Sequence, residues 1–447
     1  MAATHCGPLK VVATHCTARL KITTLNWTLP ANAPNAQYSY NGKELLQLLR
    51  STVVSHEYSQ RLCLPPELED LIMKCLSDDL AALRCASLTC RSWLAAARPY
   101  IFRYPRVHNE KTMRLLLSAL RSSPMISNCI RALRIGNPKA SDPFIRNNSV
   151  TQFLSLLSDL QNPLKNLLSL DMFGVVESWD AKVVKKMSTG LSSVASLSLG
   201  RCGVSPDELC AVLCAFPNVR HVKLEYCATV FNGRLKHAAL PTLHSPALTS
   251  LEVDDKNTLK DGMEALLDCL LGSPSRHTLR SVKLMIGEES VQSVGEFLWA
   301  LGEHLENLEL GFWLHIDTIV QLCSKAVRYV DLSHNTALQT LTLHDPSFPL
   351  TQTLLMQVAA PHLTMITLRW APKAFLCASR ALLVGVLNAE KFRKVKSVRC
   401  VYDGGFDEGM EPKMRRVFKE LDEKGILSIA PKIIVGILVR LLTAVAN

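Results

Sequence analysis

The sequence lacks the local motifs that identify several common enzyme classes. It contains no GxxxxGK[ST] loop to cradle phosphates and no GxGxxG after a strand. The pair His56 and Glu57 has no second histidine to complete HExxH, and no GxSxG nucleophile elbow occurs. We therefore expect no enzymatic activity and no catalytic residues. No motif predicts a metal or a cofactor either.

Long apolar runs are also missing. Residues 1–35 show no clean hydrophobic stretch of the kind that a secretory leader carries. Residues 433–445 are apolar, but Arg440 interrupts them and they fall short of the roughly 20 residues that cross a bilayer. We expect an apolar C-terminal tail over residues 426–447, and a membrane is not an expected partner.

Paired cysteine motifs are absent, although the chain has 15 cysteines. Without CxxC…CxxC spacing, neither a zinc site nor a disulfide framework is predicted. Cys85, Cys90, Cys210 and Cys214 lie in apolar runs and are interpreted as small core side chains. Free thiols suit a reducing compartment, which indicates cytoplasm or nucleus.

Residues 1–40 are rich in Ala, Thr, Asn and Pro and repeat ATHC at 3–6 and 13–16. A metal cluster normally uses tighter ligand pairs, so we interpret this segment as a disordered lead-in. The chain as a whole is 48% hydrophobic and 20% charged, which favours folded domains for most of it. Its length of 447 residues allows two or three domains, or a small domain followed by a repeat array.

The formal net charge of +11 favours acidic partners without naming one. Basic residues are dense between positions 98 and 134, which leaves a nucleic-acid-associated protein as an alternative. Few aromatics accompany them and no known nucleic-acid motif surrounds them, so a solvated face is expected. The residues of this basic run are Arg98, Arg103, Arg106, Lys111, Arg114, Arg121, Arg131 and Arg134.

A dense helical pattern occupies residues 64–102. Pro65 and Pro66 mark a helix start, and acidic residues in the following turn suit the helix dipole. Residues 77–79 end that helix and can cap a second, and a third passes through Trp93. Three short helices in about 40 residues hide too little surface to be stable alone, which indicates a partner.

The block reads LPPEL at 64–68 and CRSW at 90–93, and over residues 62–103 it resembles the F-box family, in particular fungal F-box proteins. That resemblance implies docking onto a Skp-type adaptor of a Skp–cullin–F-box ubiquitin ligase. One departure is Glu69, which would place a charge beside the docking face. The adaptor-binding residues implied are Leu64, Pro65, Pro66, Leu68, Ile72, Leu76, Cys90 and Trp93.

Beyond the helical block, a short apolar-x-apolar core recurs at a mean spacing of about 29 residues, with helical stretches between copies. Clear cores include Leu133 with Ile135 and Leu168 with Leu170, and a degraded tenth copy starts at Val395. Ser205 and Glu208 predict a capping box. The fold class expected over residues 104–425 is α/β, an irregular leucine-rich-repeat solenoid with a curved parallel sheet and convex helices.

Side chains between the apolar pairs should face outward on the concave side of such a sheet. These outward side chains predict a surface that binds an unknown protein substrate, with Trp313 as an aromatic anchor. Reversing the charge of Lys223 and Lys283 is expected to cost only about half a kcal/mol per site. The predicted substrate-binding residues are His221, Lys223, Glu225, Glu252, Asp254, Lys283, Glu309 and Trp313.

The chain is thus expected to be a non-catalytic substrate receptor that raises the effective concentration of a target near a ubiquitin-charged enzyme. An F-box scaffold that acts outside ubiquitin transfer is the first alternative. The nucleic-acid-associated repeat protein is the second.

Overall fold

The computed structural model describes residues 64–136, 149–160, 164–175, 181–227, 245–254, 262–313, 319–344, 348–370, 380–402 and 409–431. It also describes two short antiparallel strands, β1 (Leu25–Asn26) and β2 (Ser39–Tyr40). The chain divides into two units, residues 1–68 and residues 69–447. The other expectations for residues 1–40 and for residues 432–447 lie outside the described residues.

Three helices form where the helical pattern predicts them: α2 (Pro66–Cys75), α3 (Leu80–Ser87) and α4 (Arg91–Ile101). Asp79 caps α3, because its carboxylate accepts hydrogen bonds from the backbone N–H groups of Ala81 and Ala82, each at 3.0 Å. We call these helices the three-helix block. Its apolar core consists of Met73, Leu83, Ala86 and Ala97.

The rest of the described chain is built on one parallel sheet of 12 strands that follow one another in chain order. The sheet is open, since β3 and β14 lie at its two edges. Parallel neighbours need a crossover, and helices supply it between most strands. The strands are β3 (Arg106–Val107), β4 (Ala132–Ile135), β5 (Ser169–Phe173), β6 (Ser196–Gly200), β7 (His221–Glu225), β8 (Ser250–Asp254), β9 (Ser281–Ile286), β10 (Asn307–Phe312), β11 (Thr340–His344), β12 (Met365–Trp370), β13 (Ser397–Tyr402) and β14 (Leu427–Pro431).

Helices follow the strands and stack on one another in the same order. Their apolar sides join the strand side chains in one continuous core. They are α5 (Glu110–Ser122), α6 (Pro124–Cys129), α7 (Ser149–Ser158), α8 (Ala181–Gly190), α9 (Pro206–Ala215), α10 (Gly262–Leu271), α11 (Ser275–Thr278), α12 (Val291–Leu301), α13 (Ile319–Tyr329), α14 (Phe348–Gln357), α15 (Arg380–Leu387), α16 (Met410–Val417) and α17 (Lys419–Glu423), with short 3₁₀ turns η1 (Glu288–Ser290), η2 (Gly302–His304) and η5 (Glu390–Phe392). We call β3–β14 with these helices the strand–helix array.

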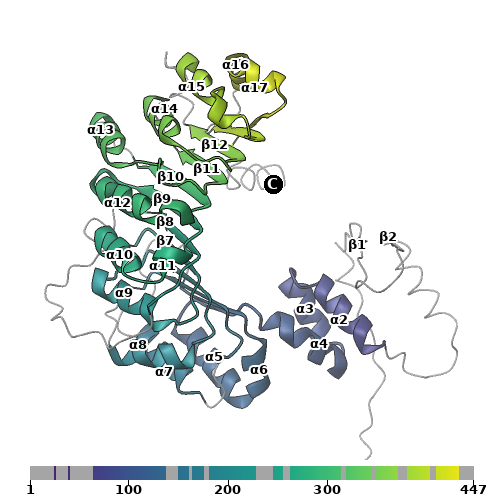
Figure 1. Ribbon diagram of the computed structural model, residues 1–447. Helices are drawn as coiled ribbons and strands as arrows, with labels where there is room; N and C mark the ends of the chain where they lie inside the picture. Colours follow the sequence, from purple (N-terminus) through teal and green to yellow (C-terminus); the bar gives the residue numbers. More distant parts are fainter. Residues whose placement is uncertain are drawn as a thin grey trace, which may run out of the picture. The chain divides into compact units, whose positions relative to one another are not determined.

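Figure 1 shows α8, α9, α10, α12 and α13 stacked along one side of strands β7–β10. Along these strands, buried residues alternate with partly exposed ones, as the period of two requires when one face packs on helices. The predicted capping box is confirmed: Ser205 Oγ accepts from the backbone N–H of Glu208 at 3.2 Å, and Glu208 Oε2 accepts from that of Ser205 at 2.8 Å.

The expected apolar cores are confirmed for most strands, but two are wrong in register. In β5 the buried pair is Leu170 and Met172, whereas Leu168 is 50% exposed. In β13 the buried pair is Val398 and Cys400, so the copy expected at Val395 starts three residues later. Leu168 forms an apolar-x-apolar pattern with Leu170, and Val395 is a buried apolar residue that precedes the strand, so each imitates the start of a core.

The sheet also extends beyond its expected limits. The two-residue strand β3 precedes the first predicted core, and β14 pairs with β13 from Leu427 to Pro431. The last strand therefore falls inside the segment that was expected to be an apolar tail. Its polar Ser428 and helix-breaking Pro431 hide the strand pattern, and pairing with β13 supplies the stabilisation that the segment lacks by itself.

Three consecutive turns share one backbone conformation. Gly174, Arg201 and Tyr226 follow aligned ends of β5, β6 and β7, and all three have positive φ angles. Each donates its N–H to a carbonyl at the end of the next strand, at 2.7–3.0 Å. This shared hydrogen bond helps to offset the energetic cost of the left-handed conformation at Arg201 and Tyr226, which are not glycine.

Candidate functional site

The central outward positions of β7–β10 bring charges of alternating sign into one row. Register places Lys223 beside Glu252, Glu252 beside Lys283, and Lys283 beside Glu309. The distances from Lys283 Nζ to the carboxylates of Glu252 and Glu309 are 2.9 and 3.6 Å. Lys223 Nζ lies 2.7 Å from Glu225 and 3.5 Å from Glu252. We call these five residues the charge ladder.

Two further side chains continue the ladder at Glu309. His344 Nε2 lies 2.7 Å from Glu309 Oε1, and Arg369 NH1 lies 3.8 Å from it. Burial raises the pKa of Glu309, but hydrogen bonding to His344 and the nearby charges of Lys283 and Arg369 outweigh it and hold that pKa below its usual value. Neither His344 nor Arg369 belongs to the predicted substrate-binding set.

The ladder offers a partner alternating signs rather than a field of one sign. The three cations Lys223, Lys283 and Arg369 balance the three carboxylates Glu225, Glu252 and Glu309. A surface of alternating charge favours register-dependent pairing with complementary charges over binding of a polyanion. The pairs are partly exposed, so each is worth at most about 1 kcal/mol to folding.

A small hollow lies over the same strands. It has a volume of about 200 Å³ and spans β8 to β11. Hydroxyl and amide side chains border it beside the ladder, and Thr340 Oγ1 donates to Asn307 Oδ1 at 2.6 Å. Its outward lining residues are Ser250, Glu252, Ser281, Lys283, Asn307, Glu309, Thr340 and Thr342.

Trp313 lies just beyond β10, where it was expected, but its side chain is held by a contact within the chain. Its indole Nε1 donates to Asp254 Oδ1 at 3.2 Å, and the ring is half-buried. Asp254 ends β8, so this bond ties the end of β10 to a strand two positions away. His221, at the start of β7, is exposed and belongs to a different outward row from the ladder.

The predicted adaptor-binding residues divide into exposed and half-buried groups. Pro65, Pro66 and Cys90 are exposed and Leu68 is 45% exposed, while Leu64 and Ile72 are half-buried. Leu76 and Trp93 pack against the block's own core, so part of each side chain is structural. On α3 and just after it, Leu80 and Leu88 are exposed by 44% and 86%, which extends the apolar surface beyond the predicted set.

Glu69 corrects an expectation. It does not place a charge beside an exposed face, because its side chain is buried and accepts a hydrogen bond from Ser92 Oγ at 2.9 Å. The serine of the CRSW sequence thus satisfies the glutamate that directly follows LPPEL. The sequence shows both residues but not that they touch.

The basic run is partly neutralised within the chain. Arg134 binds Asp171 at 2.8 Å, and Arg114 pairs with Glu110 one helical turn away. Arg131 is exposed, but it precedes β4, while Lys111 lies on α5. The run is therefore distributed over two helices and several strand ends rather than along one element.

The cysteines differ from their expected role. Cys85 and Cys90 are exposed, whereas Cys202, Cys227 and Cys400 are the buried ones among the described residues. Cys202 Sγ donates to the carbonyl of Met172 at 3.5 Å, and Cys227 Sγ donates to that of Leu199 at 3.3 Å. Each thiol thereby ties the turn after one strand to the strand before it. The sequence carries this signal as LxLxxC at 197–202 and VxLxxC at 222–227.

Cys210 and Cys214 are half-buried on α9 and interact with Cys269 of α10. Hydrogen bonds from both thiols lower the pKa of Cys269 to about 3, and the same bonds raise the pKa of Cys210 and of Cys214. Sequence spacing reveals the i, i+4 pair on α9 but not the third thiol.

No protein-family model and no curated protein matches the chain. Among solved structures, a protein from Bacteroides fragilis aligns over 73% of this chain and 82% of its own, with a TM-score of 0.34 and 12% sequence identity. Across the part of the chain that the structure describes, none of the helices combines the length and apolar character that a membrane crossing demands.

Proposed function

We propose that this chain is a non-catalytic substrate receptor of a Skp–cullin–F-box ubiquitin ligase. The three-helix block would dock a Skp-type adaptor, and the strand–helix array would hold a target protein. The array would be an irregular leucine-rich-repeat solenoid, with the charge ladder on its concave face. Catalysis would belong to the ubiquitin-charged enzyme, and this chain would act by raising effective concentration.

The observation that carries the proposal is the exposed apolar surface of a block whose own core is four side chains. Met73, Leu83, Ala86 and Ala97 are buried, while Leu80 and Leu88 remain exposed. Exposed apolar side chains rimmed by polar ones favour a protein interface. The LPPEL and CRSW sequences of the same block favour the adaptor as the protein concerned.

The repeat pattern supports the second half of the proposal. Cys202 and Cys227 occupy the N/C position of the leucine-rich pattern LxLxxN/C, and their bonds to the preceding strand suit that role. Repeat arrays bind partners through an extended sheet face. On this array, the charge ladder and the adjoining hollow offer such a face both charge register and hydrogen-bonding groups.

A charge-neutral variant tests the ladder without building repulsion into it. Glu252→Gln with Lys283→Gln removes the pair between these residues and their longer contacts with Lys223 and Glu309. It leaves Lys223 on Glu225 and Glu309 on His344, both at 2.7 Å. The expected result is loss of target proteins and retention of adaptor and cullin in a reducing affinity purification with proteasome inhibition, quantified by mass spectrometry. Glu288→Gln with Lys325→Gln is the matched control, because it removes a 2.8 Å pair among the helices.

Two outcomes would contradict the proposal. If targets survive the ladder variant and are lost in the helix control, the binding surface is wrong. If the adaptor is recovered without cullin, the chain is a scaffold that acts outside ubiquitin transfer.

A further inference from the structure

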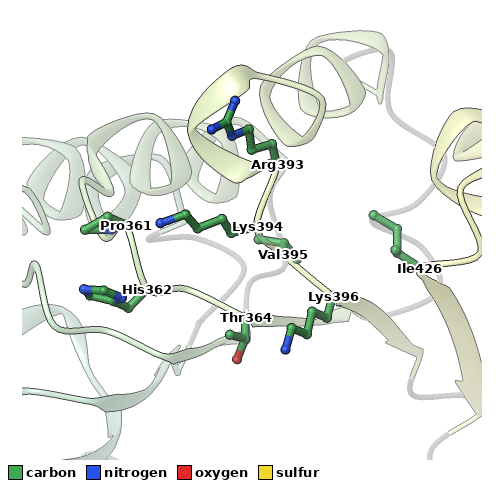
Figure 2. A pocket seen from close by; sticks show the side chains of 8 residues that line it. All are labelled: Pro361, His362, Thr364, Arg393, Lys394, Val395, Lys396 and Ile426. Carbon is green, nitrogen blue, oxygen red and sulfur yellow. The ribbon is translucent and has the colours of Figure 1, made fainter.

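A pocket with a basic lining lies at the other end of the array from β3. It has a volume of about 630 Å³ and forms where the chain enters the last three strands, β12, β13 and β14. We call it the basic pocket. Its lining residues are Pro361, His362, Thr364, Arg393, Lys394, Val395, Lys396 and Ile426 (Figure 2).

The cations of this pocket come from one short segment. Lys394 and Lys396 are exposed, whereas Val395 between them is only 6% exposed and packs into the core. The alternation follows from the extended chain that leads into β13. Figure 2 shows Lys394 reaching toward Pro361 and His362, while Lys396 extends beside Thr364.

The positive charges that line the basic pocket are not balanced by acidic lining residues. None of the 8 lining residues is acidic, and only Arg393 has a carboxylate partner among the ion pairs of the described residues, Glu390 at 2.7 Å. Both members of that pair are highly exposed, by 71% and 82%, so the pair is weak and Arg393 can exchange partners. This differs from the charge ladder, where cations and carboxylates match.

Size and wall chemistry indicate the kind of anion. A volume of 630 Å³ falls within the range of small-molecule sites and leaves room beyond a single phosphate group. Pro361, Val395 and Ile426 supply apolar wall beside the cations. Lysine binds phosphate as a point charge, and arginine binds it bidentately.

We propose that the basic pocket binds an organic phosphate of small-molecule size. Lys394, Lys396 and His362 hold the phosphate group, Arg393 joins them by leaving Glu390, and the apolar wall contacts the organic part. The proposal does not depend on the proposed function, because it uses neither the three-helix block nor the charge ladder.

Calorimetric titration of the full chain with phenyl phosphate tests it, with inorganic phosphate and phenol as partial probes at constant ionic strength. We expect saturable binding of phenyl phosphate that is about tenfold tighter than that of phosphate, because the ring buries apolar area on the wall. Phenol alone should give no saturable heat, because it lacks the phosphate group.

Lys394→Gln with Lys396→Gln should weaken phenyl phosphate binding by about tenfold or more. Lys111→Gln with Lys185→Gln, two exposed lysines on α5 and α8, should leave it unchanged. Unfolding of each variant by urea shows whether the fold is intact. Equal loss in both variants, equal affinity for phosphate and phenyl phosphate, or the absence of saturable heat would overturn the proposal.

Discussion

The three-helix block and the strand–helix array differ in the size of the apolar core that each builds. In the block, four side chains form the core while Leu80 and Leu88 stay exposed. In the array, nearly every strand contributes two buried apolar side chains, and these merge with the helices into one continuous core. The array also has exposed apolar side chains, such as Leu115 and Met125, but they stand beside a large buried core, whereas the exposed leucines of the block stand beside only four buried side chains.

Both regions also pair polar side chains within the chain. The open side of the array pairs its charges internally through the ladder, and the block ties its buried Glu69 to Ser92. Under the proposed function, the exposed leucines of the block and the charge pattern of the array would serve two interfaces with different recognition chemistry.

The largest expected effects come from cavities in each core, because the two cores are separate clusters. Leu284→Ala removes a fully buried side chain of β9 and should cost about 2–5 kcal/mol of unfolding free energy in the array. Leu83→Ala should loosen the block and abolish adaptor binding. Hydrogen exchange measured by mass spectrometry, peptide by peptide, checks both. Reduced protection of β9 in Leu83→Ala would show that the cores are coupled.

Two glycines of the array, one tightly packed and one in open space, test how closely its helices pack. At Gly295 of α12, a Cβ would lie 2.1 Å from the carbonyl oxygen of Tyr329, so Gly295→Ala should destabilise the array by about 1–3 kcal/mol. Gly385 in α15 has nothing within 4 Å of such a Cβ, and Gly385→Ala should stabilise it by about 0.5–1 kcal/mol. Urea unfolding measures both. Changes of the same sign would contradict the tight packing of α12 on α13.

The smallest effect is a pH dependence. Because the folded-state pKa of Glu309 is lowered, its ion pairs stabilise the fold above the unfolded pKa of about 4.3. That stability is lost as pH falls through the folded value. Glu309→Gln should therefore be less stable than wild type at pH 7, by about 1 kcal/mol or less, and this difference should shrink as the pH is lowered from 7 towards 3. A constant difference across that range in urea midpoints would exclude this origin.

Reversal of Lys223 and Lys283, expected from the sequence to cost little, would place five carboxylates side by side: the two new ones and Glu225, Glu252 and Glu309. The sequence predicts that these positions face outward, because the alternation of inward and outward side chains is a pattern within each single strand. It does not show that neighbouring strands align the charges, because register between strands is a property of the whole sheet. The neutral Gln variants are therefore the better test.

Periodicity predicts the helices of the block and most strands of the array, since repeated burial on one face leaves a direct trace in the sequence. It fails at Leu168 and Val395, where an apolar residue before the strand imitates the pattern. It also misses β14, whose strand is stabilised by pairing with β13. Contacts between distant segments, such as Ser92 with Glu69 and Cys269 with Cys210, have no local trace at all.

The central claim is that the block binds a Skp-type adaptor independently of the array's charge ladder. The direct measurement is the affinity of the purified full chain for a purified Skp-type adaptor under reducing conditions. We predict saturable binding that falls by about tenfold or more in Leu64→Ala with Pro65→Ala. Binding should persist in Glu252→Gln with Lys283→Gln and in Leu115→Ala with Met125→Ala, a control at two exposed apolar side chains of the array. Undiminished binding by the Leu64 and Pro65 variant with its fold intact would contradict the account.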